Sequence, residues 1–111
     1  MTLTDRTGAP VAVTEQTDRF EVAVDGRQVG LTAFAEHDVQ RVFFHTEVDE
    51  AFGGRGLATI LIEQALIATR AEGRRIVPVC PMVVAYVGKN HQFDDIIDRP
   101  TPEILTWLQS R

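Results

Sequence analysis

The stretch that most constrains the fold is HTEVDEAFGGRGLATILI, residues 45–62. It begins in a strand-like run that carries His45 and Glu47, passes through closely spaced glycines, and continues with helical periodicity. A second strand-like segment, RIVPV at residues 75–79, follows the helix. Strand, helix and strand in this order predict a β-helix-β unit whose two strands run parallel through a right-handed crossover.

The rest of the chain predicts an α/β fold. Its predicted strands are RFEVAV, VGLTAFA (29–35) and RVFFHTEV (41–48), and its predicted helices are 57–72, 81–89 and a last helix after Thr101. Asp25-Gly26 favours a hairpin turn with positive φ. We expect a single mixed sheet, with antiparallel N-terminal strands and the parallel β-helix-β pair, backed by helices. Residues 1–10 are polar, with Gly8 and Pro10, and are expected to be a loose arm.

Size and composition narrow the class of protein. The chain has 111 residues, which predicts one domain over 1–111. No apolar run approaches membrane-spanning length, and the start lacks a secretory pattern. The single cysteine favours a reducing cytoplasm, and the isolated histidines do not have metal-site spacing. A net charge of −5 argues against nucleic-acid binding. We expect a monomer or weak homodimer with no membrane partner.

Charge is unevenly distributed along the chain. Residues 53–89 carry five basic side chains against two acidic ones, which gives this segment +3 and leaves −8 for the remainder. A locally positive segment in an acidic protein favours a ligand that carries phosphate. The alternative is that Arg70, Arg74 and Arg75 only complement the negative end of a helix.

The glycines do not fit two common phosphate-binding motifs. A Walker loop requires a lysine after its last glycine, and none follows Gly53, Gly54 and Gly56. A Rossmann fingerprint requires a third glycine where Thr59 stands. What remains is a helix N-terminus whose amides lack intrahelical partners and which, with the helix dipole, forms an anion site. A simple turn would use the same glycines, so that alternative stays open.

Four blocks of sequence carry a resemblance to a known family. The blocks are HTEV, AFGGRGLA, VPVC and AYVGKN, within roughly residues 20–95. In this order they resemble the compact branch of the GCN5-related N-acetyltransferase superfamily, an acyl-CoA N-acyltransferase fold. The superfamily's loop reads [QR]-x-x-G-x-[GA]; Gly54 and Gly56 match it, and Ala51 departs from its first position. The chain has no room for the helices that larger members insert after the first strand, which implies an open acceptor site.

The resemblance implies acetyl-CoA as co-substrate, an amine as acceptor and no metal. It implies that the pantetheine arm pairs like an extra strand near Thr46 and Val48, where a backbone amide would polarise the thioester. Lys89 would reach a CoA phosphate, unless it is only an exposed lysine at a helix end. The residues implied for the pyrophosphate are Gly53, Gly54, Arg55, Gly56, Leu57 and Ala58.

His45 and Glu47 are the first catalytic candidates. Acetyl transfer to an amine is helped by a general base, and either side chain could serve, or Glu47 could orient His45. The alternative is a hydrogen-bonded pair without a catalytic role. Strict alternation along the strand would place Phe43, His45 and Glu47 on one face and Val42, Phe44, Thr46 and Val48 on the other.

Cys80 and Tyr86 are the rival candidates. Pro81 suits the first position of a helix, which makes Cys80 its N-cap, where the helix dipole favours a thiolate. Cys80 could accept the acetyl group or protonate the CoA sulfur; the alternative is a small buried side chain. The resemblance implies Tyr86 as a general acid, but packing with its hydroxyl at the rim is the simpler role. We therefore predict an acetyl-CoA-dependent N-acetyltransferase, with a non-catalytic CoA-binding or protein-interaction module as the alternative.

Overall fold

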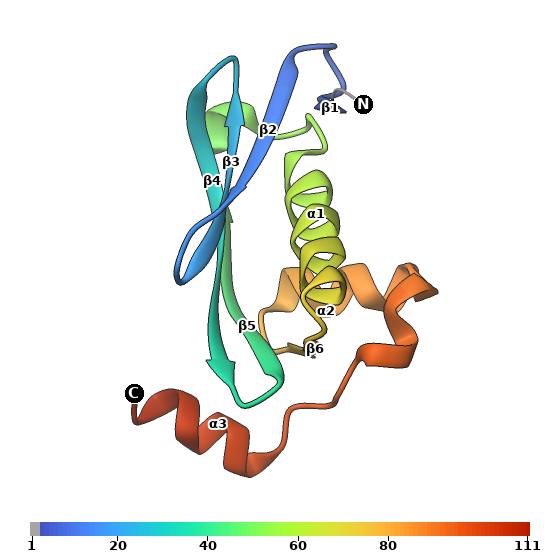
Figure 1. Ribbon diagram of the computed structural model, residues 1–111. Coiled ribbons are helices and arrows are strands. Elements are labelled where there is room, and N and C mark those ends of the chain that lie inside the picture. The colour runs from blue at the N-terminus through green and yellow to red at the C-terminus, as the bar shows by residue number, and fades with distance from the viewer. Residues whose placement is uncertain (1–2) are drawn as a thin grey trace.

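The computed structural model describes residues 3–111, and it forms a six-stranded sheet with helices on both faces (Figure 1). The strands are β1 (Leu3–Thr4), β2 (Pro10–Glu15), β3 (Arg19–Val24), β4 (Arg27–His37), β5 (Gln40–Val48) and β6 (Arg75–Pro78). The helices are α1 (Leu57–Ala71), α2 (Pro81–Lys89) and α3 (Pro102–Gln109), and the 3-10 helices are η1 (Glu50–Phe52) and η2 (His91–Ile96).

The sheet confirms the predicted mixed topology. Its strands follow chain order from β1 to β6, and every neighbouring pair is antiparallel except β5 and β6. The β-helix-β unit is therefore parallel, as predicted. The β3–β4 hairpin turns at Asp25 and Gly26 with φ of 50° and 81°, the left-handed geometry expected there. Strand β6 is an edge strand and ends at Pro78, which has no amide to donate.

The expectation of a loose arm over residues 1–10 is wrong for residues 3–10. Leu3 and Thr4 form β1 and pair with the start of β2, and a turn joins the two strands. Strand β2 itself was not predicted, although Val11 and Val13 alternate with polar or small neighbours as in a half-buried strand. Residues 1 and 2 lie outside the described part of the chain.

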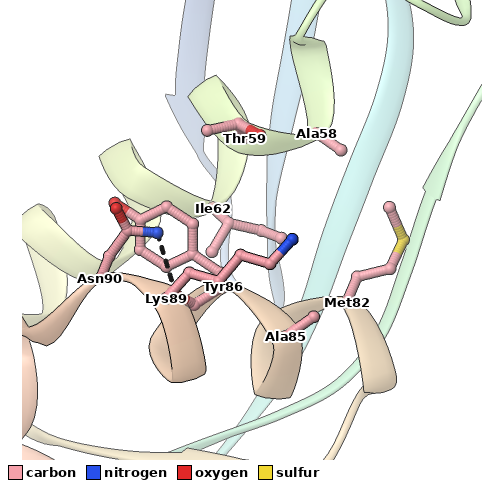
Figure 2. A pocket seen from close by; sticks show the side chains of 8 residues that line it. All are labelled: Ala58, Thr59, Ile62, Met82, Ala85, Tyr86, Lys89 and Asn90. Atoms are coloured by element: carbon pink, nitrogen blue, oxygen red, sulfur yellow. Dashed lines mark hydrogen bonds between the residues drawn. The ribbon is translucent and has the colours of Figure 1, made fainter.

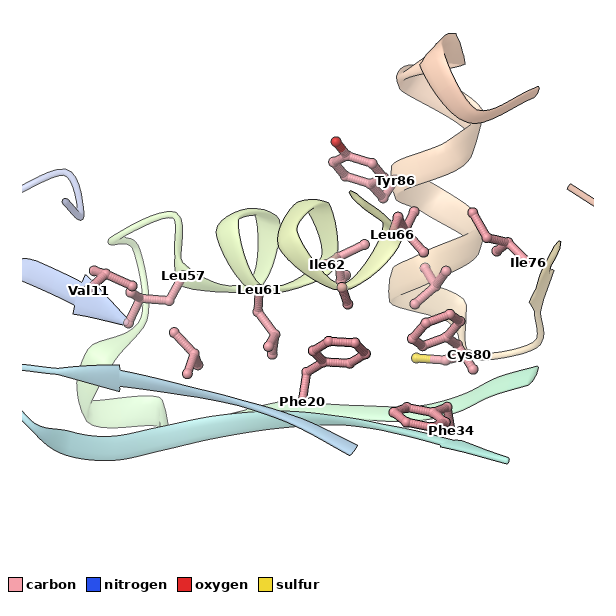
Figure 3. Packing of buried hydrophobic residues seen from close by; sticks show 14 of the residues in the cluster. Val11, Phe20, Phe34, Leu57, Leu61, Ile62, Leu66, Ile76, Cys80 and Tyr86 are labelled. Atoms are coloured by element: carbon pink, nitrogen blue, oxygen red, sulfur yellow. The ribbon is translucent and has the colours of Figure 1, made fainter. Parts of the chain in front are cut away.

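The main core lies between the sheet and α1 (Figure 3). Leu57, Leu61 and Leu66 of α1 are at most 2% exposed, and they pack above the aromatic side chains of the sheet. Phe20 and Phe34, with ring centroids 5.5 Å apart, lie beneath the helix. The helical stripe predicted from sequence is therefore the buried face of α1.

A β-bulge at Phe44 overturns the predicted division of faces along β5. The pairing register jumps from Ala33 opposite His45 to Phe34 opposite Phe43, so Phe44 has no partner in β4. An extra residue in one strand reverses the alternation beyond it. As a result Phe43 packs in the main core, whereas His45 is exposed on the other face.

Helix α3 covers the opposite face of the sheet, at one end only (Figure 1). Thr101 caps it by accepting a hydrogen bond from the Ile104 amide, as its sequence predicted. Ile104 packs with Val42 and Val77 in a second, small cluster, which Trp107 joins with its ring 4.5 Å from the ring of His37. Among residues 3–111, no helix is long and apolar enough to cross a membrane.

A charged side chain of β5 lies inside the molecule. Arg41 of β5 is 1% exposed, with its guanidinium carbon 4.3 Å from the ring centroid of Phe34. It pairs with Glu36 at 2.8 Å, Glu72 at 3.0 Å and Glu15 at 3.6 Å. Burial disfavours the charge, but the hydrogen bonds donated to Glu72 and Glu36 outweigh it and raise the pKa of Arg41 above its ordinary value.

Candidate functional site

The glycine loop that joins η1 to α1 needs two of its glycines for their backbone geometry. Gly54 and Gly56 have φ of 76° and 77°, a region in which a side chain is strained. Gly53 is extended, and its amide donates to the Glu50 carbonyl at 3.1 Å. The loop thus turns the chain into α1 with Gly56 as an N-cap that has no side chain to cap the helix.

The loop leaves a run of backbone amides without partners. In the described residues, no hydrogen bond is donated by any amide from Gly54 to Thr59, and the first helical bond runs from the Ile60 amide to the Gly56 carbonyl. The predicted run began at Gly53, whose amide is in use. A series of free amides at the positive end of a helix dipole is suited to an anion with several oxygens.

Strand β5 has an open edge beyond Phe43. The amides of Val79 and Cys80 both donate to the Phe43 carbonyl, at 3.0 and 2.9 Å, and there β6 leaves β5. The Asp49 amide donates to the Val29 carbonyl of β4. Because every second residue of an antiparallel strand bonds to the same neighbour, the backbone groups of Thr46 and Val48 point away from β4. These groups have no strand beside them and can pair with an extended ligand.

A groove leads from the open edge over the helix N-terminus. One cavity of about 340 Å³ lies at the glycine loop and another of about 260 Å³ lies between α1 and α2; they share Ala58, Thr59 and Met82. In Figure 2 the side chains of α1 and α2 face each other across the second cavity, with Lys89 reaching over it. Its walls are mostly apolar, supplied by Ile62, Ala85 and Tyr86.

Cys80 lies at the inner side of the open edge, as the N-cap of α2. Its side chain is 3% exposed, and its thiol donates to the Thr46 hydroxyl at 3.3 Å. That hydroxyl shares a second hydrogen bond of 2.9 Å with Thr32 of β4. The predicted cap position is confirmed, and the thiol is placed where β5 and β6 diverge. Thr32 was not predicted to be part of this chain of hydrogen bonds, because only strand register brings it to Thr46.

His45 and Glu47 lie on the outer face of the sheet, on the other side of the same edge. The His45 Nε2 and Glu47 Oε2 atoms are 3.4 Å apart, and the two side chains are 57% and 62% exposed. The two are therefore neighbours, as predicted. The structure brings Cys80 and Thr46 together but separates this pair from them by the thickness of the strand.

Tyr86 is buried in the wall of the groove. Its hydroxyl donates to Glu63 at 3.1 Å and accepts from Gln92 at 3.2 Å. Burial, together with the Glu63 carboxylate, raises the pKa of Tyr86 to about 12. A phenol that holds its proton this firmly is poorly matched to a thiolate leaving group. The geometry supports packing, with the hydroxyl at the rim.

The positive charge of residues 53–89 is largely neutralised within the fold. Each of its four arginines pairs with a carboxylate from outside the segment: Arg55 with Asp5, Arg70 with Asp95, Arg74 with Glu36 and Arg75 with Asp98. Within residues 53–89, Lys89 is therefore the basic side chain without a carboxylate partner among the described residues, and the role predicted for it at a phosphate stays a prediction. These ion pairs could not be predicted from the sequence, because they join residues far apart in the chain.

A third cavity, of about 440 Å³, opens where β4 begins and β5 ends. It is lined by the ends of β4 and β5, including Leu31 and Val48, and by the carboxylates of Glu47, Asp49 and Glu50. Its lining is acidic, and it includes Glu47, whose side chain lies on the outer face. This arrangement suits a cationic group that approaches the edge from the side opposite α1.

Comparison with protein families identifies one match. The sequence model of the family described as GCN5-related N-acetyl-transferase matches residues 19–96, which is more than half of the chain. No curated protein matches the chain by sequence.

Comparison with solved structures finds acetyltransferase folds. A GCN5-like protein from Staphylococcus aureus, solved by NMR and assigned as an N-acetyltransferase, has a TM-score of 0.63 and 15% identity, over 82% of this chain and 91% of that one. An N-acetyltransferase from Staphylococcus aureus Mu50 has a TM-score of 0.47 and 20% identity, over 66% of this chain and 43% of that one. An aminoglycoside acetyltransferase from an uncultured soil metagenomic sample, in complex with sisomicin, has a TM-score of 0.46 and 12% identity, over 86% and 58%.

Proposed function

Since the chain belongs to the GCN5-related N-acetyltransferase family, we propose that it transfers an acetyl group from acetyl-CoA to an amine. One observation carries the proposal for this chain: the open edge of β5 leads directly to the free amides from Gly54 to Thr59. An extended arm that ends in a diphosphate matches both features. This match supports the proposal that the chain binds CoA at the edge of β5 and the glycine loop.

The proposal assigns each part of the site to a part of CoA. The free amides of the loop and first turn of α1 bind the pyrophosphate, with Leu57 and Ala58 among the donors. The backbone groups of Thr46 and Val48 pair with the pantetheine arm. Lys89, for which no carboxylate partner occurs among residues 3–111, contacts a phosphate at the far end of the groove.

The two faces of the edge would divide the chemistry. The amine nitrogen attacks the thioester carbon, the carbon–sulfur bond breaks, and the amine proton is lost to a base. His45 or Glu47 takes that proton from the outer face, where an amine can approach. The Cys80 thiol, on the inner face, returns a proton to the departing CoA sulfur. A backbone amide of Thr46 or Val48 stabilises negative charge on the thioester oxygen.

The acceptor is proposed to be a cationic amine, such as a polyamine or a lysine side chain. The cavity lined by Glu47, Asp49 and Glu50 supports this, because it lies on the side from which the acceptor would arrive. A carboxylate-rich surface raises the local concentration of cations. The base must then take one proton from the ammonium group before attack and release it to solvent, so that it can accept the second nitrogen proton during transfer.

The direct test is calorimetry with acetyl-CoA, followed by turnover with a panel of polyamines and lysine peptides, monitored through release of the CoA thiol. We expect Cys80→Ala and Glu47→Gln to reduce kcat by roughly a hundredfold while acetyl-CoA affinity changes little. A wild-type protein that binds no acetyl-CoA contradicts the proposal.

A non-catalytic CoA-binding module is the second candidate. It is favoured by the exposure of His45 and Glu47, which nothing in the described residues covers on the outer face. This candidate predicts tight binding of acetyl-CoA with no acetyl transfer to any amine of the panel. The same calorimetric and turnover measurements distinguish the two.

A further inference from the structure

The N-terminal segment places an arginine against the glycine loop. The Arg6 amide donates to the Arg55 carbonyl at 3.1 Å, and its guanidinium donates to the Gly54 carbonyl at a longer 3.5 Å. A Cβ added at Gly56 would lie 3.3 Å from the Arg6 Nε. The guanidinium therefore lies over the same residues whose amides are free.

The position of Arg6 is set by a structured turn between β1 and β2. Asp5, which is 5% exposed, accepts hydrogen bonds from the Thr7 amide at 2.8 Å, the Thr7 hydroxyl at 2.7 Å and the Ala9 amide at 3.1 Å. The Asp5 amide also donates to the Ala9 carbonyl. This turn presents Arg6 to the loop from outside the part of the chain that the family shares, which begins at residue 19.

Arg55, although it lies within the loop, is less available than Arg6. Its guanidinium pairs with the buried Asp5 carboxylate at 3.4 Å and lies 4.8 Å from the ring centroid of Phe52. Arg6 is exposed and, throughout residues 3–111, no carboxylate lies within ion-pair distance of it. Arg6 is thus the cation beside the loop that can still take an anion.

Arg6 also lies between two cavities at the loop. It lines the cavity of about 340 Å³ over the glycines and another of about 250 Å³ between the N-terminal turn and α1. Gly56 and Thr59 line both. An anion seated on the amides would therefore have the guanidinium beside it without displacing any part of the core.

We propose that Arg6 is a further CoA-binding residue, contributed by the N-terminal turn, and that it binds the pyrophosphate. This inference rests on the proposed function. The helix N-terminus offers only about half a positive charge, whereas a diphosphate carries two negative charges. A guanidinium can hold phosphate oxygens through two parallel hydrogen bonds, a geometry that lysine lacks.

The test compares acetyl-CoA with 3′-dephospho-acetyl-CoA, which retains the pyrophosphate, by calorimetry on the full chain. Arg6→Ala is expected to weaken the binding of both ligands by a similar factor of about ten, which is the loss typical of one charge-assisted contact. Arg6→Lys is expected to recover part of that loss. The salt dependence of binding should also become shallower in Arg6→Ala.

Arg99→Ala is the matched control, since Arg99 is an exposed arginine in the segment between η2 and α3. It removes the same charge far from the loop and should leave both affinities unchanged. Equal affinities for Arg6→Ala and Arg99→Ala would overturn the inference. If Arg6→Ala weakens the binding of acetyl-CoA but not of 3′-dephospho-acetyl-CoA, Arg6 contacts the 3′-phosphate, and the assignment to the pyrophosphate is overturned. If the wild type binds neither ligand, the proposed function fails as well.

Discussion

At its Arg41 end β5 has a strand on each side, whereas at its Thr46 end it has a strand on one side only. Around Arg41, carboxylates from three other elements surround a buried charge. Around Thr46 and the glycine loop, backbone groups face a groove with no protein partner. One strand thus combines a closed end, where a buried charge is paired, with an open end, where backbone groups face a groove.

The difference indicates where stability and function reside. The closed end holds the sheet, α1 and the β4–β5 hairpin together through a shared cation, and changes there should affect folding. The open end retains donors that a ligand can use, and changes there should affect binding more than folding. Substitutions at either end can separate these two roles.

The largest effect is expected at the closed end. Arg41→Ala leaves Glu15, Glu36 and Glu72 close together without their cation, and it should lower the free energy of unfolding by about 3 kcal/mol, measured by urea denaturation. Arg74→Ala is the control, because Arg74 contacts the same Glu36 at 3.0 Å from a more exposed position. Its cost should be below about 1 kcal/mol. Equal losses of unfolding free energy in the two variants would show that the burial of Arg41 does not add to the effect of losing its charge.

The next largest effect is expected at the glycine loop. Gly56→Ala and Gly26→Ala both force a side chain into positive φ, at 77° and 81°, and each should cost about 1 kcal/mol of stability. Only Gly56→Ala should also weaken the binding of acetyl-CoA, by roughly tenfold, because its Cβ would lie 3.3 Å from the Arg6 Nε. Calorimetry beside thermal denaturation separates the two effects. A binding defect in Gly26→Ala would mean that the loop is not the site.

The smallest effect is a pH dependence of the N-terminal turn. Hydrogen bonds from Thr7, together with those from the Ala9 amide and the charge of Arg55, hold the pKa of Asp5 below its usual 3.8. A carboxyl group with a lowered pKa contributes stability above its unfolded value, and the contribution is lost as pH falls through the folded value. Asp5→Asn should therefore have a lower Tm than wild type near neutrality, with the difference shrinking below about pH 4. A constant difference over the acid range would contradict this account.

The regular elements were predictable because each carries a local signal. The period of two in β3, the switch to helical period at Leu57, Pro81 after a capping residue, and Thr101 before Pro102 each appear within a few residues of sequence. Strand β2 had the same alternation, but the nearby Gly8 and Pro10 favoured a loose arm. The error shows that turn residues mark a boundary without excluding a strand beyond it.

The features that organise the site were not predictable, because each depends on contacts between distant residues. The bulge at Phe44 follows from the pairing of β4 with β5, and it decides that His45 and Glu47 face outward. The neutralisation of Arg55 depends on Asp5, and the position of Arg6 depends on the β1–β2 turn. The glycine loop itself was recognisable from its spacing, whereas the electrostatics around it were not.

The chain contains a single tryptophan, and its location has a practical consequence for spectroscopy. Trp107 belongs to α3, packs with the small cluster around Ile104 and lies against His37. That face of the sheet is opposite to the groove. Intrinsic fluorescence should therefore report whether α3 is docked. It should change little if the proposed ligand, acetyl-CoA, binds in the groove, so that emission can follow the C-terminal helix independently of ligand occupancy.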